Sequence, residues 1–151
     1  MPSALDLQDQ LFDAVNNHDL DRILECFSAD AVYVAPIGVM EGHEQLTWYF
    51  EQLFAGFPDV SVTPWSRAAY EDSAVAECTV TGTQSGIFLL PDGRMLQPTG
   101  RRITIRCSCF TSAEHGKIIS CRVYFDQLEL FSQLGVDSLP GSRGAPPPAS
   151  E

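Results

Sequence analysis

The spacing of apolar residues changes near residue 60, and this change is the strongest constraint on the fold. Before that point, apolar side chains recur at the three- and four-residue spacing of amphipathic helices. After it, they alternate with more polar residues, as in strands with one buried face. The alternating segments are residues 60–62, 74–80, 103–109 and 119–125. A helical first half followed by a run of strands predicts an α+β domain, in which a curved, mostly antiparallel sheet wraps around N-terminal helices.

The helical part contains signals for three helices and one strand. Ser3, with Asp6 three residues later, forms the capping pattern of a first amphipathic helix, and Asp19 is a natural N-cap for a second. The β-branched and aromatic residues 31–35 predict a strand, which the Pro and Gly residues just after it would stop. A third amphipathic helix is expected after Gly42.

The connections between the later strands favour antiparallel pairing. Residues 70–73 and 113–116 are turn sequences, whereas residues 85–100 predict a longer loop. Residues 128–134 have the spacing of a short closing helix, which Gly135 would end. We therefore expect a sheet of neighbouring strands, followed by one helix.

The length of the chain is suited to one domain with a buried core. It has 151 residues, of which 44% are apolar, and this is too few for two domains. We expect that domain over residues 1–135. Residues 136–151 are rich in Pro, Gly and Ser and have little to bury, so we expect a disordered tail there.

The charge balance argues against two classes of partner. The chain has 20 acidic and 9 basic residues, and its net charge of −11 repels phosphate backbones and anionic lipid surfaces. No apolar run approaches the roughly 20 residues that a membrane-spanning helix needs, and the first residues lack the pattern of a secretory signal. We expect no nucleic acid, no membrane and a cytoplasmic location, where the five cysteines stay reduced.

Several short segments carry a resemblance to a known family. They are residues 17–21 leading into 27–32, 57–59, the 81–86 turn, 100–102, 116–118, 124–126 and 133–135. Their order and spacing resemble the SnoaL-like polyketide cyclase family of the nuclear transport factor 2-like superfamily. The resemblance implies a cone-shaped α+β barrel, often dimeric, with an apolar pocket that opens at one end. It leaves the activity open, because the superfamily includes cyclases, isomerases, epoxide hydrolases and non-catalytic subunits.

The resemblance also implies where catalysis would occur. In cyclases of this family, a carboxylate and a histidine on the last two long strands point into the cone and transfer protons without a cofactor. The corresponding positions here are Cys109, Cys121 and Val123. The remaining carboxylate is Asp126, at a place where similar sequences also have Asp, and apolar neighbours would suit it to proton transfer. The alternative is that Asp126 caps the closing helix.

The aromatic residues of the first half are candidates for the substrate pocket. Tyr33, as a second catalytic residue, and Tyr49 could donate hydrogen bonds to a carbonyl oxygen, and ordinary aromatic packing is the alternative. The other residues that we expect around the substrate are Trp48, Phe50, Ile105, Cys109, Cys121, Val123 and Phe125.

Three cysteines are predicted to share one patch. Cys107 and Cys109 lie on one face of a strand, and the following hairpin would bring Cys121 across from Cys109. A soft-metal site, a redox pair or a thiolate nucleophile would each need a further ligand or an activating base. No histidine has a suitable spacing, so we predict reduced, metal-free thiols that serve as small core residues.

The opposite face of the same strand is polar. Arg102, Thr104 and Arg106 lie there, with Glu77 and Thr79 on the corresponding face of a neighbouring strand. This face could form the interface of a homodimer, and the alternative is a solvated sheet face with exposed ion pairs.

These observations leave three candidate functions. The first is a cofactor-independent acid/base enzyme of the cyclase or isomerase type, which acts on a hydrophobic carbonyl compound through Asp126, with Tyr33 or Tyr49 as hydrogen-bond donor. The second is a non-catalytic binding protein for an apolar small molecule. The third is a dimerisation module whose cone is filled with side chains. The direction in which Asp126 points, and the size of the pocket, discriminate between them.

Overall fold

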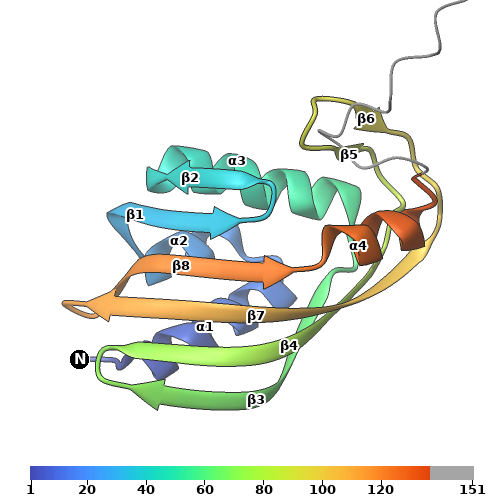
Figure 1. Ribbon diagram of the computed structural model, residues 1–151. Helices are drawn as coiled ribbons and strands as arrows, with labels where there is room; N and C mark the ends of the chain where they lie inside the picture. The colour runs from blue at the N-terminus through green and yellow to red at the C-terminus, as the bar shows by residue number, and fades with distance from the viewer. Residues whose placement is uncertain (137–151) are drawn as a thin grey trace, which may run out of the picture.

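One curved sheet is the framework of the protein (Figure 1). The computed structural model describes residues 1–136. The strands of the sheet are β1 (Phe27–Ala35), β2 (Gly38–Glu41), β3 (Ser61–Tyr70), β4 (Ser73–Thr83), β7 (Arg102–Glu114) and β8 (Lys117–Phe125). Their order across the sheet is β2-β1-β8-β7-β4-β3. All neighbouring strands are antiparallel except β1 and β8, which are parallel.

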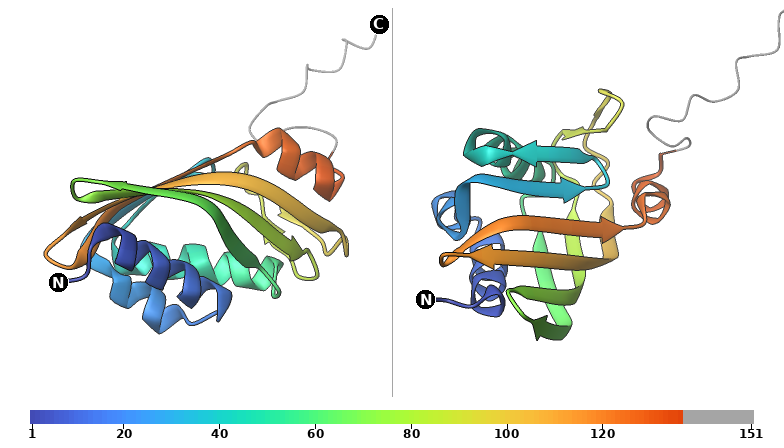
Figure 2. Two further views of the ribbon diagram at one scale, coloured as in Figure 1. Left: turned by 90° about the horizontal axis from the view of Figure 1, so that it is seen from below. Right: turned by 60° about the vertical axis from the view of Figure 1, so that its left-hand side comes forward.

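Three of the helices cover one face of this sheet. The helices are α1 (Ala4–Asn16), α2 (Leu20–Cys26), α3 (Gly42–Gly56) and α4 (Gln127–Leu134). Figure 2 shows α1, α2 and α3 together on the concave side of the sheet, whereas α4 is set apart from them. The α+β class and the curved, mostly antiparallel sheet are therefore confirmed. The sheet does not close into a barrel, because β2 and β3 remain as its two edges within the described residues.

The helix boundaries follow from the predicted capping residues. The Ser3 hydroxyl accepts a hydrogen bond from the Asp6 backbone N–H at 3.1 Å, and the Asp6 carboxylate accepts one from the Ser3 N–H at 3.0 Å. The Asp19 carboxylate accepts from the Arg22 N–H at 3.1 Å. Gly135 ends α4 with a φ of 76°, in the left-handed region that favours glycine.

Two segments differ from the expectation. Residues 38–41 form strand β2, because Gly38, with a φ of 147°, reverses the chain and pairs the segment with β1. The loop between residues 85 and 100 contains a small hairpin of β5 (Phe88–Leu89) and β6 (Met95–Leu96). Two-residue strands are too short to produce a periodic sequence pattern, so alternation could not predict them.

The apolar core has two parts. The larger part lies between α1, α2, α3 and the concave face of the sheet and includes Leu11, Ile23, Leu46 and Ile118. The second part packs α4 against the inner face of β7, with Phe131 and Ile105 among its members. The core therefore occupies the space that a cone-shaped fold encloses.

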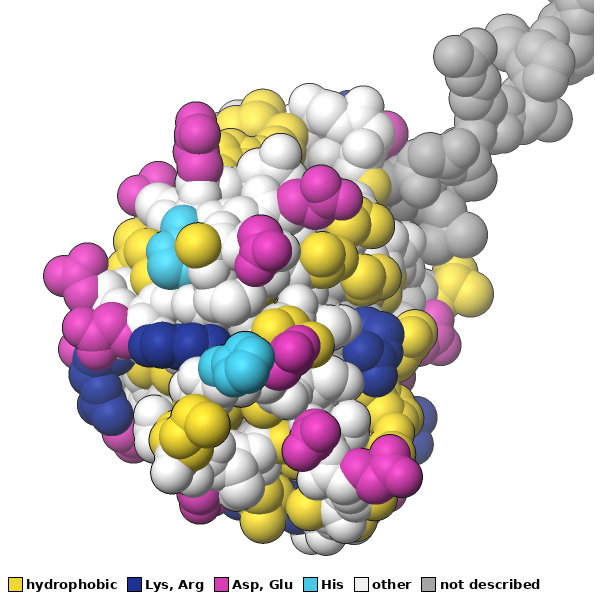
Figure 3. Space-filling model, turned by 90° about the vertical axis from the view of Figure 1, so that its left-hand side faces the viewer, with side chains coloured by type: hydrophobic (Ala, Val, Ile, Leu, Met, Phe, Trp, Pro, Cys, Tyr) yellow, Lys and Arg dark blue, Asp and Glu magenta, His cyan; other side chains and the backbone are white. Residues whose placement is uncertain are grey.

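Acidic side chains outnumber basic ones in the chain. Figure 3 shows more acidic than basic side chains on the face that it presents, in keeping with the net charge of −11. Among the described helices, none has the length and apolar character needed to cross a membrane. The disordered tail was predicted over residues 136–151, and of these, residues 137–151 lie outside the described residues.

Candidate functional site

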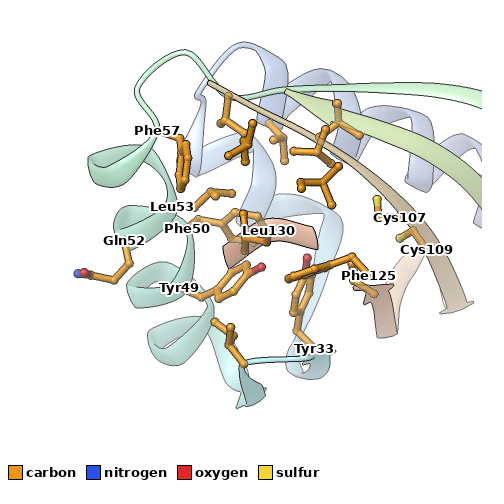
Figure 4. A pocket seen from close by; sticks show the side chains of 18 of the residues that line it. Tyr33, Tyr49, Phe50, Gln52, Leu53, Phe57, Cys107, Cys109, Phe125 and Leu130 are labelled. Carbon is orange, nitrogen blue, oxygen red and sulfur yellow. The ribbon is translucent and has the colours of Figure 1, made fainter. Parts of the chain in front are cut away.

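A cavity of about 160 Å³, here called the central cavity, lies between α3 and the inner faces of the strands (Figure 4). Its wall is formed by apolar side chains from α1, α3, α4 and the sheet. The predicted substrate-binding residues all line it: Trp48, Tyr49, Phe50, Ile105, Cys109, Cys121, Val123 and Phe125. Tyr33 lines it as well. The sequence therefore located the wall of the cavity, whereas a role for these residues in binding stays a prediction.

The alternation along β7 explains how the cavity obtains its wall. Ile103, Ile105 and Cys107 point toward the cavity, and Thr104 and Arg106 between them point away and are exposed. Trp48 and Gln52 lie toward the opposite wall, on α3, and Trp48 is half exposed. The cavity therefore has an inner end among the strands and an outer end beside α3.

The tyrosines bring two hydroxyl groups into an otherwise apolar wall. The rings of Tyr33 and Tyr49 have centroids 5.0 Å apart, and Figure 4 shows both hydroxyls pointing into the cavity. Burial raises the pKa of Tyr49 to about 12 and raises the pKa of Tyr33 well above its usual value. A hydrogen bond between the two side chains adds to the shift for Tyr33 and opposes it for Tyr49. Both phenols are therefore protonated at neutral pH, and each can donate one hydrogen bond, either to the other phenol or to a ligand.

The cysteines form two close pairs on the inner face of the sheet. The Cys109 and Cys121 sulfurs are 3.5 Å apart, and the Cys109 sulfur lies 3.7 Å from the Thr111 hydroxyl oxygen. Cys78 and Cys107 stand directly opposite each other on β4 and β7. The expected register is corrected in one detail: Cys121 lies opposite Thr111 rather than Cys109. Glu114 pairs with Lys117 beside the turn, and the irregularity at residues 112–113 then shifts the pairing by one residue, which puts Cys121 on the same face as Cys109.

The thiol pairs differ in which sulfur would ionise. The contact between the two thiols lowers the pKa of Cys109, whereas the same contact and burial raise the pKa of Cys121. In the other pair, a hydrogen bond to Cys78 and burial raise the pKa of Cys107. Cys109 is therefore the cavity thiol with the most stabilised thiolate.

The sequence-based prediction did not include two buried polar residues that lie beside the cysteines. Thr111 and Gln8 are fully buried, and the Gln8 Nε2 donates to the Thr111 hydroxyl at 3.0 Å and to the Cys109 carbonyl at 3.2 Å. A signal was present for both. Thr111 continues the inward alternation of residues 103–109, and Gln8 lies four residues after the buried Ala4 and three before the buried Leu11 on an apolar helix face.

Asp126 lies at the N-terminus of α4, outside the set of residues that line the central cavity. Its side chain is exposed and accepts a hydrogen bond from the Leu128 N–H at 2.9 Å, which is the geometry of a helix cap. This is the alternative that its place in the sequence allowed. The catalytic assignment of Asp126 stays a prediction.

The central cavity has no charged side chain among its described lining residues. Its polar side chains are the two tyrosines, the thiols of Cys107, Cys109 and Cys121, Trp48, and Gln52, whose amide points away from the cavity in Figure 4. Over the described range 1–136, no three side chains of His, Cys, Asp or Glu are grouped so that they could hold a metal ion. The chemistry available in the cavity is therefore hydrogen-bond donation by phenols and nucleophilic attack by a thiol.

The comparison with protein families gives one match. The model of a family described as the SnoaL-like domain matches residues 9–121, which is most of the chain and includes both tyrosines and all the cysteines. No match was found among proteins with curated functions.

Several solved structures share this fold. AclR from Streptomyces galilaeus, named as a candidate hydroxylase, is 26% identical over 85% of this chain and 92% of its own, with a TM-score of 0.73. IdmH from Streptomyces antibioticus, named as a candidate polyketide cyclase, is 24% identical over 89% of this chain and 100% of its own, with a TM-score of 0.74. A candidate SnoaL-like polyketide cyclase from Jannaschia is 22% identical over 89% of this chain and 93% of its own, with a TM-score of 0.78.

Proposed function

This chain belongs to the SnoaL-like domain family, and we propose that its central cavity binds a hydrophobic carbonyl compound whose oxygen accepts hydrogen bonds from Tyr33 and Tyr49. The observation that carries the proposal is the pair of phenol hydroxyls in a wall that is otherwise apolar. An apolar wall favours a ligand with little polar surface, and two neutral donors at one point favour a single acceptor oxygen. The volume of about 160 Å³ is suited to a compound with one aromatic ring.

The same two donors would lower the energy of an enolate. When a proton leaves the carbon beside a carbonyl, negative charge develops on the carbonyl oxygen, where Tyr33 and Tyr49 would donate to it. We propose cofactor-independent acid/base chemistry of the cyclase or isomerase type on this basis, with Asp126 as the predicted proton-transfer group. The structural relatives named as candidate cyclases support this reaction class.

A second candidate is binding without catalysis. It is favoured by the composition of the cavity wall, whose described residues include neither a carboxylate nor an imidazole. It is also favoured by the exposed position of Asp126. Under this candidate, the tyrosines orient the ligand, and no proton is transferred.

Binding can be tested with two ligands of nearly the same shape. Acetophenone carries a carbonyl group, and α-methylstyrene has a methylene group in its place. Calorimetric titration of Tyr33→Phe and of Tyr49→Phe should show acetophenone binding about 2- to 10-fold more weakly than to wild type, as for the loss of one neutral hydrogen bond. Binding of α-methylstyrene should change little. Tyr124→Phe is the matched control, because Tyr124 is 53% exposed and does not line the cavity. An equal loss for both ligands would contradict the proposal.

Catalysis can be separated from binding by hydrogen exchange. Proton NMR in D₂O would follow the entry of deuterium into the methyl group of acetophenone, which requires its enolate. The enzyme hypothesis expects faster exchange with wild type, slower exchange with Tyr33→Phe, and none above background with Asp126→Asn. Faster exchange that persists in Asp126→Asn would remove Asp126 as the base. Bound acetophenone without exchange would establish the binding candidate.

We also propose that the chain forms a homodimer through the outer face of β4 and β7. That face carries Arg102, Thr104 and Arg106, which point away from the cavity. Sedimentation velocity at several protein concentrations should give a dimer. A monomer at every concentration would contradict this proposal, but it would not affect the proposal about ligand binding.

A further inference from the structure

Cys109 has surroundings that set it apart from the other thiols of the cavity. Its sulfur lies 3.5 Å from the Cys121 sulfur and 3.7 Å from the Thr111 hydroxyl oxygen. The Thr111 oxygen accepts a hydrogen bond from Gln8 Nε2 at 3.0 Å, which leaves the Thr111 hydrogen free to point at the Cys109 sulfur. The thiol of Cys121 supplies a second donor. Because Gln8, Thr111 and Cys121 are fully buried, water does not compete for these donors.

Cys107 provides an internal comparison on the same strand face. It also lines the central cavity and is more exposed than Cys109. Its partner is Cys78, which stands directly opposite on β4. That contact stabilises the protonated form of Cys107, whereas the contacts of Cys109 stabilise its thiolate. The thiolate is the nucleophilic form, so its stabilisation favours Cys109 as the reactive residue, whereas exposure alone would favour Cys107.

The thiol pair and the tyrosine pair lie on the same part of the wall. Tyr33 on β1 stands opposite Cys121 on β8, and Cys121 contacts Cys109 on β7. Figure 4 shows the tyrosine hydroxyls and the Cys109 sulfur around one space. A ligand whose carbonyl oxygen is at the tyrosines therefore has room to extend toward the sulfur of Cys109.

We propose that Cys109 adds reversibly to α,β-unsaturated carbonyl compounds that bind in the central cavity. This inference rests on the proposed function and names its substrate class. The Cys109 sulfur forms a bond to the β carbon, and the electron pair of the carbon–carbon double bond moves into an enolate whose oxygen Tyr33 and Tyr49 hold. The proton released by the thiol ends on the α carbon. Nothing leaves the ligand, and neither an oxidant nor a reductant is needed.

Two phenyl ketones that differ in one double bond provide the test. Benzylideneacetone is α,β-unsaturated, and benzylacetone is its saturated counterpart. Intact-protein mass spectrometry should show one added benzylideneacetone per chain, and peptide mapping should place it on Cys109. Benzylacetone should bind without a change in mass. Thermal unfolding of every variant would confirm that it is folded.

Substitutions of single cysteines and of Thr111 show which sulfur reacts and whether its hydrogen-bond donor matters. Cys109→Ser and Cys109→Ala should lose the adduct, and Thr111→Val should form it about 10- to 100-fold more slowly, as expected for the loss of one hydrogen bond to a charged sulfur. Cys107→Ser should still form the adduct, and on Cys109. Cys26→Ser is the matched control, because Cys26 is a buried thiol that does not line the cavity.

The possible failures can be told apart. An adduct on Cys107 or Cys26, or bound benzylacetone with no benzylideneacetone adduct, would overturn the assignment to Cys109 and leave the proposed binding function intact. If neither ketone binds or reacts with wild type, the proposed function fails together with the inference. An adduct that forms equally fast in Thr111→Val would show that the donor chain does not activate the sulfur.

Discussion

The two faces of the β7–β8 hairpin have opposite chemical characters, although their residues alternate along the same strands. The inner face carries Ile105, Cys109 and Cys121, which are nearly or fully buried. The outer face carries residues such as Arg106 and Tyr124, both largely exposed. This difference shows which functional groups a ligand in the cavity can meet. Charged groups lie on the outer face, so reactions in the cavity depend on neutral donors and thiols.

The largest expected effect comes from truncating neighbouring isoleucines that point to opposite faces of β8. Ile118 is fully buried in the core, and Ile119 is 36% exposed. Ile118→Ala should lower the free energy of unfolding by about 2–4 kcal/mol, because it removes buried methyl groups and leaves a cavity. Ile119→Ala should change it by less than about 0.5 kcal/mol. Urea denaturation measures both, and similar losses at the two positions would break the distinction between the faces.

The second prediction uses the raised pKa values of the inner tyrosines. A tyrosine in an unfolded chain ionises near pH 10, whereas burial raises the pKa of Tyr49 in the folded protein to about 12. Between these values the unfolded state binds fewer protons than the folded state, so stability falls as pH rises. Tyr49 alone would contribute a slope of up to about 1.4 kcal/mol per pH unit.

The measurement is the urea stability of wild type, Tyr49→Phe and Tyr124→Phe from pH 8 to pH 11. Tyr49→Phe should show a shallower decline than wild type above pH 10. Tyr124→Phe controls for the loss of a phenol from the outer face. If the decline in Tyr49→Phe is as steep as in wild type, the Tyr49 hydroxyl is not shielded from water.

Local signals in the sequence predicted most of the framework. Ser3, Asp19 and Gly135 act as helix caps because capping depends on neighbours within a few residues, which the sequence displays directly. Period-two alternation located the inner faces of β4 and β7, and that of β8 from Cys121 on, for the same reason. At the start of β8 it was wrong, because the ladder irregularity buries Ile118 and leaves Ile119 exposed. The same alternation predicted the residues of the cavity wall, because inward positions on a curved sheet face the helices.

Other features depend on contacts between distant segments. The close approach of the Cys109 and Cys121 sulfurs depends on an irregular ladder at residues 112–113, which shifts the register between two strands. Asp126 has apolar neighbours in sequence, but its carboxylate turns to the start of α4 and into solvent. Sequence proximity does not determine on which side of a strand end a side chain points.

The third prediction concerns this helix cap. Asn accepts the capping hydrogen bond about as well as Asp, so Asp126→Asn should leave the free energy of unfolding within about 0.5 kcal/mol of wild type. Asp126→Ala should lower it by about 1 kcal/mol, because the Leu128 N–H loses its side-chain acceptor. Thermal or urea unfolding provides the comparison. An unchanged stability in Asp126→Ala would show that the cap contributes little, and would strengthen the case that Asp126 is retained for another reason.

The smallest effect is expected at the ion pair between Arg106 on β7 and Glu129 on α4. Their charged atoms are 3.7 Å apart, and the Arg106 side chain is 79% exposed, so water and salt screen the attraction. Arg106→Gln should change the free energy of unfolding by less than about 0.5 kcal/mol at low protein concentration. The proposed dimer makes the same variant informative, because association would bury this face. A loss of stability that grows with protein concentration would place Arg106 in the interface between two chains, whereas a small loss at every concentration would leave the outer face solvated.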